Sequence, residues 1–202
     1  MKILGLTGPS GSGKGALEAF FAKHGIPFLD TDAVYHDITS KKSSPCLLEL
    51  QAAFGDFILD KNGALDRPAL AAYVFDETAD KASRLARLND ITHKYVLKEA
   101  RAWLDEQEKK GYKAAIIDAP LLYESAFDRE CDYVIAVLAP RETRIARIML
   151  RDSITLKAAE ARVNAQKDDD FYKSHADFVI VNDSSVERLD EEAKSVIARL
   201  NL

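Results

Sequence analysis

Residues 2–15 read KILGLTGPSGSGKG, an apolar run followed by a glycine-rich segment and a lysine, and a helical pattern comes next. Strand, loop and helix in this order are the context in which a glycine-rich segment binds phosphate. The glycines permit positive φ and close approach to an anion, while the amides that follow lie at a helix N-terminus. Lys14 then reaches the β- and γ-phosphates of a nucleotide. The alternative to a phosphate-binding loop is a glycine-rich turn between strand and helix with an exposed lysine. The predicted nucleotide-binding residues are Gly8, Gly11, Ser12, Gly13, Lys14, Gly15 and Ala16.

Gly15 departs from the usual pattern, in which a Ser or Thr hydroxyl at this position supplies a ligand to Mg²⁺. Either water fills that coordination position, which Mg²⁺ accepts because it usually keeps several waters, or metal use is weakened. We favour the water, because Lys14 and every glycine of the motif remain.

Composition narrows the class of protein. The 202 residues carry 28 Lys and Arg against 33 Asp and Glu, a net charge of −5 that disfavours binding to a nucleic-acid backbone. The two cysteines lack metal-site spacing and fit reduced thiols in the cytoplasm. The first apolar run is too short for a signal peptide or a membrane span. We expect one cytoplasmic domain with no membrane, nucleic-acid or obligate protein partner.

Strand-like runs alternate with helical patterns, which predicts an α/β protein with a mostly parallel five-stranded sheet and helices on both faces. The runs are 2–7, 26–30, 113–118, 132–139 and 177–183.

Two intervals interrupt this alternation. Between residues 32 and 111 the only strand candidate is FILD (57–60), and helices are expected to begin at Ser44 and at Asp66. A long helix should place the following side chains inward: Leu85, Leu88, Thr92, Tyr95, Val96 and Trp103. The second interval runs from 140 to about 176 and includes Asp168–Asp170, interpreted as a solvated turn.

The terminal helix is predicted to start with a capping box, Ser184 with Glu187. Its apolar stripe should be Val186, Leu189, Ala193, Val196, Ile197 and Leu200.

Acidic residues follow two of the predicted strands. Asp32 comes just after the second strand, at the carboxyl edge where open α/β sheets bind ligands, and can orient and deprotonate an acceptor hydroxyl. Its alternative is a helix N-cap. Asp118 closes the third strand and can position Mg²⁺ through water, or it is a strand-end turn residue.

Three arginines, Arg144, Arg147 and Arg151, share one helical face at spacings of three and four. Such a run is either a solvated basic face or a lid whose arginines close on phosphates. In the lid interpretation, the main phosphate-binding candidates are Arg147 and Arg151. His93 is interpreted as a structural or substrate-contacting side chain rather than a metal ligand.

Beyond the loop, several segments in order along the chain resemble the dephospho-CoA kinase family. They are LDTDAVYH (29–36), GALDRPALAAYVF (63–75), THK (92–94), DAPLLYES (118–125), RIMLRD (147–152) and ADFVIVNDSS (176–185). With residues 4–14 they cover nearly the whole chain. Lys94 stands where the family has proline.

The resemblance implies a three-layer P-loop, nucleoside-monophosphate-kinase-like fold. Its nucleotide core would span about 1–33, 112–140 and 176–202, with a helical acceptor insertion at about 34–111 and a lid at about 141–175. It also implies that MgATP phosphorylates the ribose 3′-hydroxyl of dephospho-CoA. A nucleoside or nucleotide kinase and an ATP-binding homologue impaired by Gly15 are the alternatives.

The resemblance also assigns roles. Asp32, Lys14 and Arg147 would be catalytic, Asp118 would serve the metal, and Asn182 and Arg151 would join the nucleotide site. Acceptor-binding residues would be Asp32, His36, Arg67, His93, Pro120, Leu121 and Leu122.

Overall fold

The structure is a computed structural model that describes residues 1–76 and 80–202. In the described residues, a five-stranded parallel sheet forms the central layer. The strand order is β2-β3-β1-β4-β5. The strands are β1 (Lys2–Thr7), β2 (Phe28–Asp30), β3 (Ala114–Asp118), β4 (Tyr133–Leu138) and β5 (Phe178–Val181). All five predicted runs are confirmed: β1 has the predicted bounds, and the other four strands are shorter than predicted. Strand β3 is buried along its whole length, which explains its unbroken apolar sequence.

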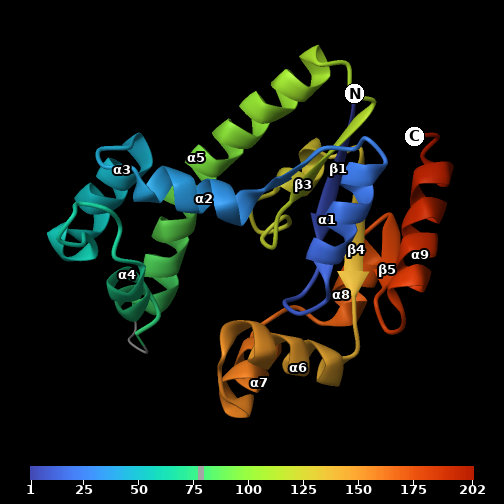
Figure 1. The fold of residues 1–202 in the computed structure, drawn as a ribbon. Coiled ribbons are helices and arrows are strands. Elements are labelled where there is room, and N and C mark those ends of the chain that lie inside the picture. The colour runs from blue at the N-terminus through green and yellow to red at the C-terminus, as the bar shows by residue number, and fades with distance from the viewer. Residues whose placement is uncertain (77–79) are drawn as a thin grey trace. The chain divides into compact units, whose positions relative to one another are not determined.

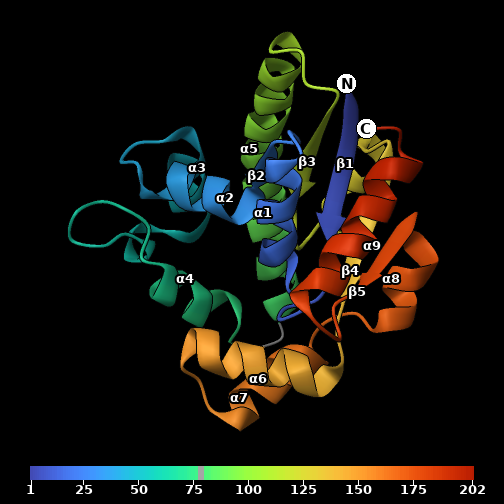
Figure 2. The ribbon, with the colours of Figure 1, turned by 45° about the vertical axis from the view of Figure 1, so that its right-hand side comes forward.

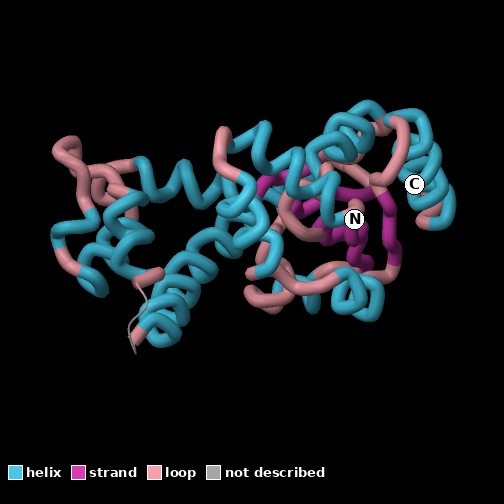
Figure 3. The backbone as a smooth tube through the Cα atoms, turned by 90° about the horizontal axis from the view of Figure 1, so that it is seen from below, coloured by secondary structure: helices cyan, strands magenta, loops and turns pink. Residues whose placement is uncertain are grey.

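Helices cover both faces of the sheet. Helices α1 (Lys14–Lys23) and α9 (Val186–Arg199) pack against the face that carries Ile135 and Val137 of β4 (Figures 1 and 2). The alternate residues Ala136 and Leu138 pack on Tyr172 of α8 (Asp169–His175) on the other face. Figure 3 shows the strands of this part of the chain between helices. The expected three-layer α/β architecture is confirmed.

The chain divides into two compact units. The first combines Met1–Asp30 with Leu104–Leu202 and contains the sheet. It also holds α6 (Arg141–Asp152), α7 (Leu156–Asn164) and a short 3₁₀ helix at Phe127–Glu130. The second unit is Thr31–Trp103, and the predicted insertion that overlaps it includes residues 77–79, which lie outside the described residues.

Helices build the second unit around a core of their own. They are α2 (Thr31–Ser40), α3 (Pro45–Phe54), a 3₁₀ turn at Asp56–Ile58, α4 (Arg67–Val74) and the larger part of α5 (Lys81–Lys109). The core includes Cys46, Leu47, Leu50, Ile58, Leu65, Leu70, Val74 and Ile91. The six side chains predicted to face inward from the long helix are all buried or half-buried.

Helix starts in the second unit follow the sequence. Ser44 caps α3 by accepting a hydrogen bond from Leu47 N, and Asp66 caps α4 by accepting one from Ala69 N, so both predictions are confirmed. The strand candidate at residues 57–60 does not form a strand of a sheet. Within the described residues this segment forms a 3₁₀ turn and one antiparallel bridge, Leu59 to Leu65, because it has no neighbouring strand to pair with.

Three expectations near the C-terminus need correction. Helix α9 is capped by Ser185, whose side chain accepts from Arg188 N, one residue later than predicted. Val186 is 66% exposed, so it lies off the buried stripe of that helix. Asp168–Asp170, predicted to be a solvated turn, instead form the start of α8, where the Asp168 side chain caps the helix by accepting from Phe171 N. In the described parts of the chain, no helix is both long and apolar enough to cross a membrane.

Candidate active site

The glycine-rich loop follows β1 and packs closely on its neighbours in the first unit. Gly8 has φ +138°, and a Cβ there would lie 2.2 Å from the carbonyl oxygen of Val137. Gly13 has φ +98°, and its Cβ would lie 2.0 Å from Asn182 Nδ2. Side chains at these positions are excluded by both backbone conformation and space. The loop therefore keeps its backbone bare at the carboxyl edge of the sheet.

Two loop amides are used inside the loop itself. Ser12 N donates to Pro9 O at 3.2 Å, and Ala16 N donates to Gly13 O at 3.0 Å. The Ala16 amide, which was predicted to contact the anion, donates here to the bond that starts helix α1. The amides of Gly13, Lys14 and Gly15 lie at the N-terminus of α1, the end of a helix that attracts anions.

Lys14 is the first residue of α1, and its ammonium group is held between the loop and the sheet. Its Nζ lies 3.4 Å from Gly8 O and 4.0 Å from Asp118 Oδ1. Strand register sets Asp118 beside Asp30 of β2 and beside Leu6 of β1. Parallel pairing of the three strands therefore brings two carboxylates and a lysine to one edge of the sheet.

Asp118 has a strongly perturbed acidity. The pKa of its carboxyl is raised to about 8: burial raises it most, the nearby Lys14 lowers it, and Glu18 and Asp30 add to the increase. The direction is an increase, because removal from water disfavours the anion more than one lysine at this distance favours it. A cation that replaces or adds to Lys14 at this carboxylate favours the ionised form.

Arg147 and Asn182 hold the middle of the loop. Arg147 Nη1 donates to the carbonyl oxygens of Gly11 and Ser12, each at 3.2 Å, and Nη2 donates to Asn182 Oδ1 at 3.3 Å. Asn182, which is 8% exposed, donates from Nδ2 to Ser12 O at 2.8 Å. The structure thus joins helix α6, the end of β5 and the loop in one hydrogen-bonded group.

Arg151 reaches the same loop from one turn further along α6. Its Nη2 donates to Ser10 Oγ at 3.3 Å, and its Nε donates to Asp152 Oδ1 at 2.7 Å. Asp152 also pairs with Arg162 of α7. Arg151 is exposed, so it is the arginine of this face that is most accessible to a ligand.

Two contributors to the loop were not assigned from the sequence. Arg144 and Gln166 both contact Ser10, through its carbonyl oxygen and its amide respectively. Helical spacing had placed Arg144 on the face that reaches the loop, which was a usable signal. Nothing in the sequence around Gln166 points to this contact.

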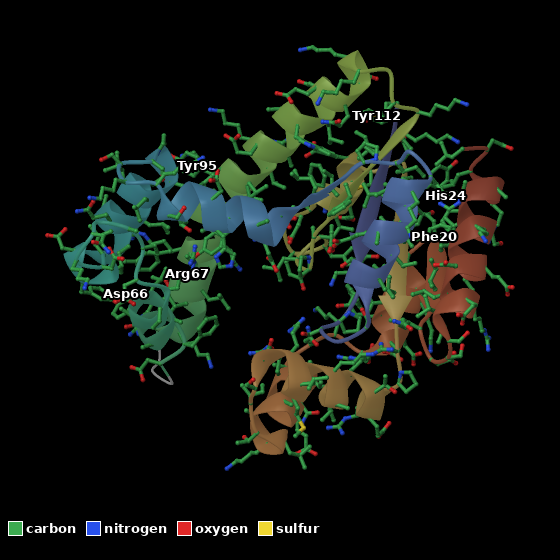
Figure 4. All side chains as sticks on the ribbon, viewed as in Figure 1. Phe20, His24, Asp66, Arg67, Tyr95 and Tyr112 are labelled. Carbon is green, nitrogen blue, oxygen red and sulfur yellow. The ribbon has the colours of Figure 1, made fainter. Side chains whose placement is uncertain are left out.

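The second unit carries four of the predicted acceptor residues. Asp32 and His36 are exposed and lie four residues apart on α2. Arg67, labelled with its neighbour Asp66 in Figure 4, begins α4 and donates from Nη2 to His36 O at 3.2 Å and to Thr39 Oγ1 at 3.3 Å. His93 is half-buried in α5. Within this unit, Arg67 is therefore joined to the helix that bears Asp32.

Lys94, the departure from the family pattern, has a role of its own. Its Nζ lies 2.7 Å from Glu49 Oε2 on α3, and the hydroxyl of Tyr95, labelled in Figure 4, donates to the same oxygen at 2.6 Å. The lysine and tyrosine lower the pKa of the Glu49 carboxyl. The lysine continues α5 as a regular helix and ties it to α3, so the departure is accommodated locally.

The segment after β3 is split between core and surface. Leu122 is fully buried and packs so closely on β1 that a Cβ at Gly5 would lie 2.8 Å from its Cδ2. Leu121 is 46% exposed, and Pro120 is half-buried. Because Leu122 is fully buried, it can affect a pocket only indirectly, by packing beneath the exposed residues of this segment.

A strand, a glycine loop without side chains and a lysine at the start of the next helix, all at the carboxyl edge of a parallel sheet, define the class of P-loop nucleotide-binding proteins. The model of the dephospho-CoA kinase family matches residues 2–188. A dephospho-CoA kinase of Corynebacterium glutamicum is 36% identical over 200 residues, which cover 99% of this chain and 98% of that protein. The chain belongs to the dephospho-CoA kinase family.

Solved structures agree with this assignment. A Thermus thermophilus protein superposes with a TM-score of 0.80 at 30% identity, over 98% of this chain and 97% of that one. Dephospho-CoA kinase from Campylobacter jejuni superposes with a TM-score of 0.62 at 26% identity, again over 98% and 97%.

Proposed function

We propose that the protein transfers the γ-phosphoryl group of ATP to the ribose 3′-hydroxyl of dephospho-CoA, giving CoA and ADP. The observation that carries this proposal is the family match across residues 2–188, joined to a loop in which Gly8, Gly11 and Gly13 leave no room for side chains. Family membership identifies the acceptor, because the loop reports only the phosphate donor.

The first unit would bind the nucleotide. Lys14 and the amides at the start of α1 hold the β- and γ-phosphates, and Arg151 approaches them from α6. Arg147 stabilises the charge on the group in transfer. Its guanidinium is hydrogen-bonded to loop carbonyls and to Asn182, so its position is already fixed before the nucleotide binds.

Residues of the second unit would bind the acceptor. Asp32 orients the 3′-hydroxyl and accepts its proton, while His36, Arg67 and His93 contact the rest of dephospho-CoA. Hydrogen bonds from Arg67 to α2 support this proposal, since they fix the helix that presents Asp32. Pro120, Leu121 and Leu122, which lie in the first unit, would contribute to acceptor binding by packing.

Mg²⁺ would accompany ATP. A divalent ion neutralises phosphate charge and orients the terminal group for transfer. Asp118 fits this ion as a carboxylate beside Lys14, with water completing the shell. The described residues contain no set of three or more His, Cys, Asp or Glu side chains placed to hold a metal, which suits an ion that arrives with the nucleotide. Free, unbridged Cys46 and Cys131 support a cytoplasmic location.

The decisive experiment supplies MgATP together with dephospho-CoA, adenosine or a nucleoside monophosphate, and identifies the product by mass. We expect ADP release that depends on dephospho-CoA and a product with the mass of CoA. Phosphorylation of a different acceptor would replace the proposal with another small-molecule kinase activity. Nucleotide binding without any acceptor turnover would favour an impaired homologue.

A further inference from the structure

Ser10 of the glycine loop is held by three side chains from the segment between β4 and β5. Gln166 Oε1 accepts from Ser10 N at 3.0 Å, and Arg144 Nε donates to Ser10 O at 3.1 Å. Arg151 Nη2 donates to Ser10 Oγ at 3.3 Å. Both backbone polar groups and the side chain of one loop residue are therefore satisfied from this segment.

Arg144, which donates to Ser10 O, is a buried arginine. It is 5% exposed, and a buried guanidinium is tolerated only when its charge and its donors are matched. Its Nη2 donates to Gln166 Oε1 at 3.0 Å, and its Nη1 lies 3.9 Å from Asp169 Oδ1. The backbone of Arg144 also abuts the loop, since a Cβ at Gly11 would lie 2.7 Å from Arg144 O.

Gln166 closes this arrangement into a ring. Its single oxygen accepts from Ser10 N and from Arg144 Nη2, while Arg144 Nε returns to Ser10 O. Ser10, Arg144 and Gln166 thus fix one another without using Lys14 Nζ or the amides of Gly13, Lys14 and Gly15. The ring sits at the start of the turn that leads to Lys14.

We propose that Arg144 and Gln166 are positioning residues that set the backbone of Ser10 and, through it, the direction of the loop amides toward the nucleotide phosphates. This inference rests on the proposed function only in taking ATP as the donor. Positioning matters because a phosphate site of fixed amides gains its affinity from geometry arranged before binding. If the ring of hydrogen bonds is lost, the loop amides are still present, but their orientation toward the phosphates is no longer fixed.

A matched pair of variants at position 166 tests the proposal. Gln166→Glu keeps an acceptor at the same length and places its charge beside Arg144, whereas Gln166→Met keeps the length and removes the acceptor. ADP affinity is measured by calorimetry without any acceptor substrate, and kcat and KM for ATP are measured with dephospho-CoA. We expect Gln166→Met to weaken ADP binding about tenfold and to raise KM for ATP similarly, with Gln166→Glu staying within about twofold of the wild type.

A second pair addresses the arginine and serves as a control for folding. Arg144→Met should weaken ADP binding at least as much as Gln166→Met. Arg141→Met, which removes a neighbouring arginine whose bond goes to Asn164 at 3.0 Å, should leave ADP affinity unchanged. Urea unfolding verifies that each variant is folded before binding is compared.

The outcomes separate this proposal from the proposed function. Equal ADP affinities for Gln166→Met and Gln166→Glu would overturn the positioning role, whatever the acceptor is. A failure of dephospho-CoA as acceptor would overturn the proposed function and leave the ADP comparison intact.

Discussion

Lys14 Nζ lies 4.0 Å from Asp118 Oδ1, and the two side chains are only 14% and 9% exposed. An ammonium and a carboxylate so placed are neither a tight hydrogen-bonded pair nor two solvated charges. Burial dominates at Asp118, whereas the lysine is held in part by Gly8 O. At this separation the attraction between the two groups is weaker than in a direct salt bridge.

The raised pKa of Asp118 predicts a pH-dependent stability of the nucleotide-free protein. The folded state holds the proton more tightly than the unfolded chain, in which the pKa is near 3.8, so this contribution is full at low pH and is lost as the pH rises through about 8. Asp118→Asn removes the titration. We expect the free energy of unfolding of the wild type, relative to Asp118→Asn, to fall by at least about 1 kcal/mol between acid and mildly alkaline pH.

Urea unfolding of both proteins across this pH range measures the effect, and differences between the two cancel the titration of the other groups. A difference that is flat with pH would show that the pKa of Asp118 is the same in the folded and unfolded states.

Position 15 tests the missing hydroxyl. The space around a Cβ at Gly15 is open, so Ser and Ala both fit without moving a neighbour. Each should stabilise α1 by up to about 1 kcal/mol, because glycine is a poor helix residue. We expect Gly15→Ser, but not Gly15→Ala, to lower the Mg²⁺ concentration needed for half-maximal rate.

Titration of the rate with Mg²⁺ at fixed ATP gives the comparison, with Gly15→Ala controlling for the change in helix propensity. Identical Mg²⁺ requirements in the two variants would mean that water serves this position as well as a hydroxyl does.

Gly13 should tolerate no side chain. Alanine there combines φ +98° with a Cβ 2.0 Å from Asn182 Nδ2, so the loop must move or Asn182 must leave Ser12 O. We expect Gly13→Ala to weaken ADP binding about tenfold or more and to lower thermal stability. Calorimetry with ADP measures this, and Gly15→Ala is the matched glycine control. Wild-type affinity in Gly13→Ala would disprove the tight fit.

Asp32 is expected to act on the acceptor rather than on ATP. It is exposed in the first turn of α2, where a carboxylate can meet a hydroxyl from solution. Asp32→Asn should lower kcat by about 10²–10⁴-fold while ADP affinity stays near that of the wild type. Asp37→Asn, an exposed acid on the same helix, is the control. Parallel losses of turnover and nucleotide affinity in Asp32→Asn would reject its role as base.

Much of the fold was predictable because its signals are local. The sheet strands are short apolar runs that have to be buried, and the caps at Ser44 and Asp66 act within three residues. Where local signals compete, prediction was less accurate. Ser184 and Ser185 are both suitable N-cap residues, and the capping-box spacing to Glu187 favoured Ser184, whereas the structure uses Ser185.

The site divides along the same line. The amino-acid sequence by itself determined the glycine loop, its lysine and the arginine face of α6, because glycine freedom and helical spacing are properties of a short segment. Only the tertiary structure decided that Arg144 is buried, that Gln166 closes on Ser10 and that Asn182 binds Ser12 O. These contacts join residues separated by 134 to 170 positions, and their partners are backbone atoms that every residue possesses. No sequence pattern can specify such a contact, because it depends on where the sheet brings distant segments together.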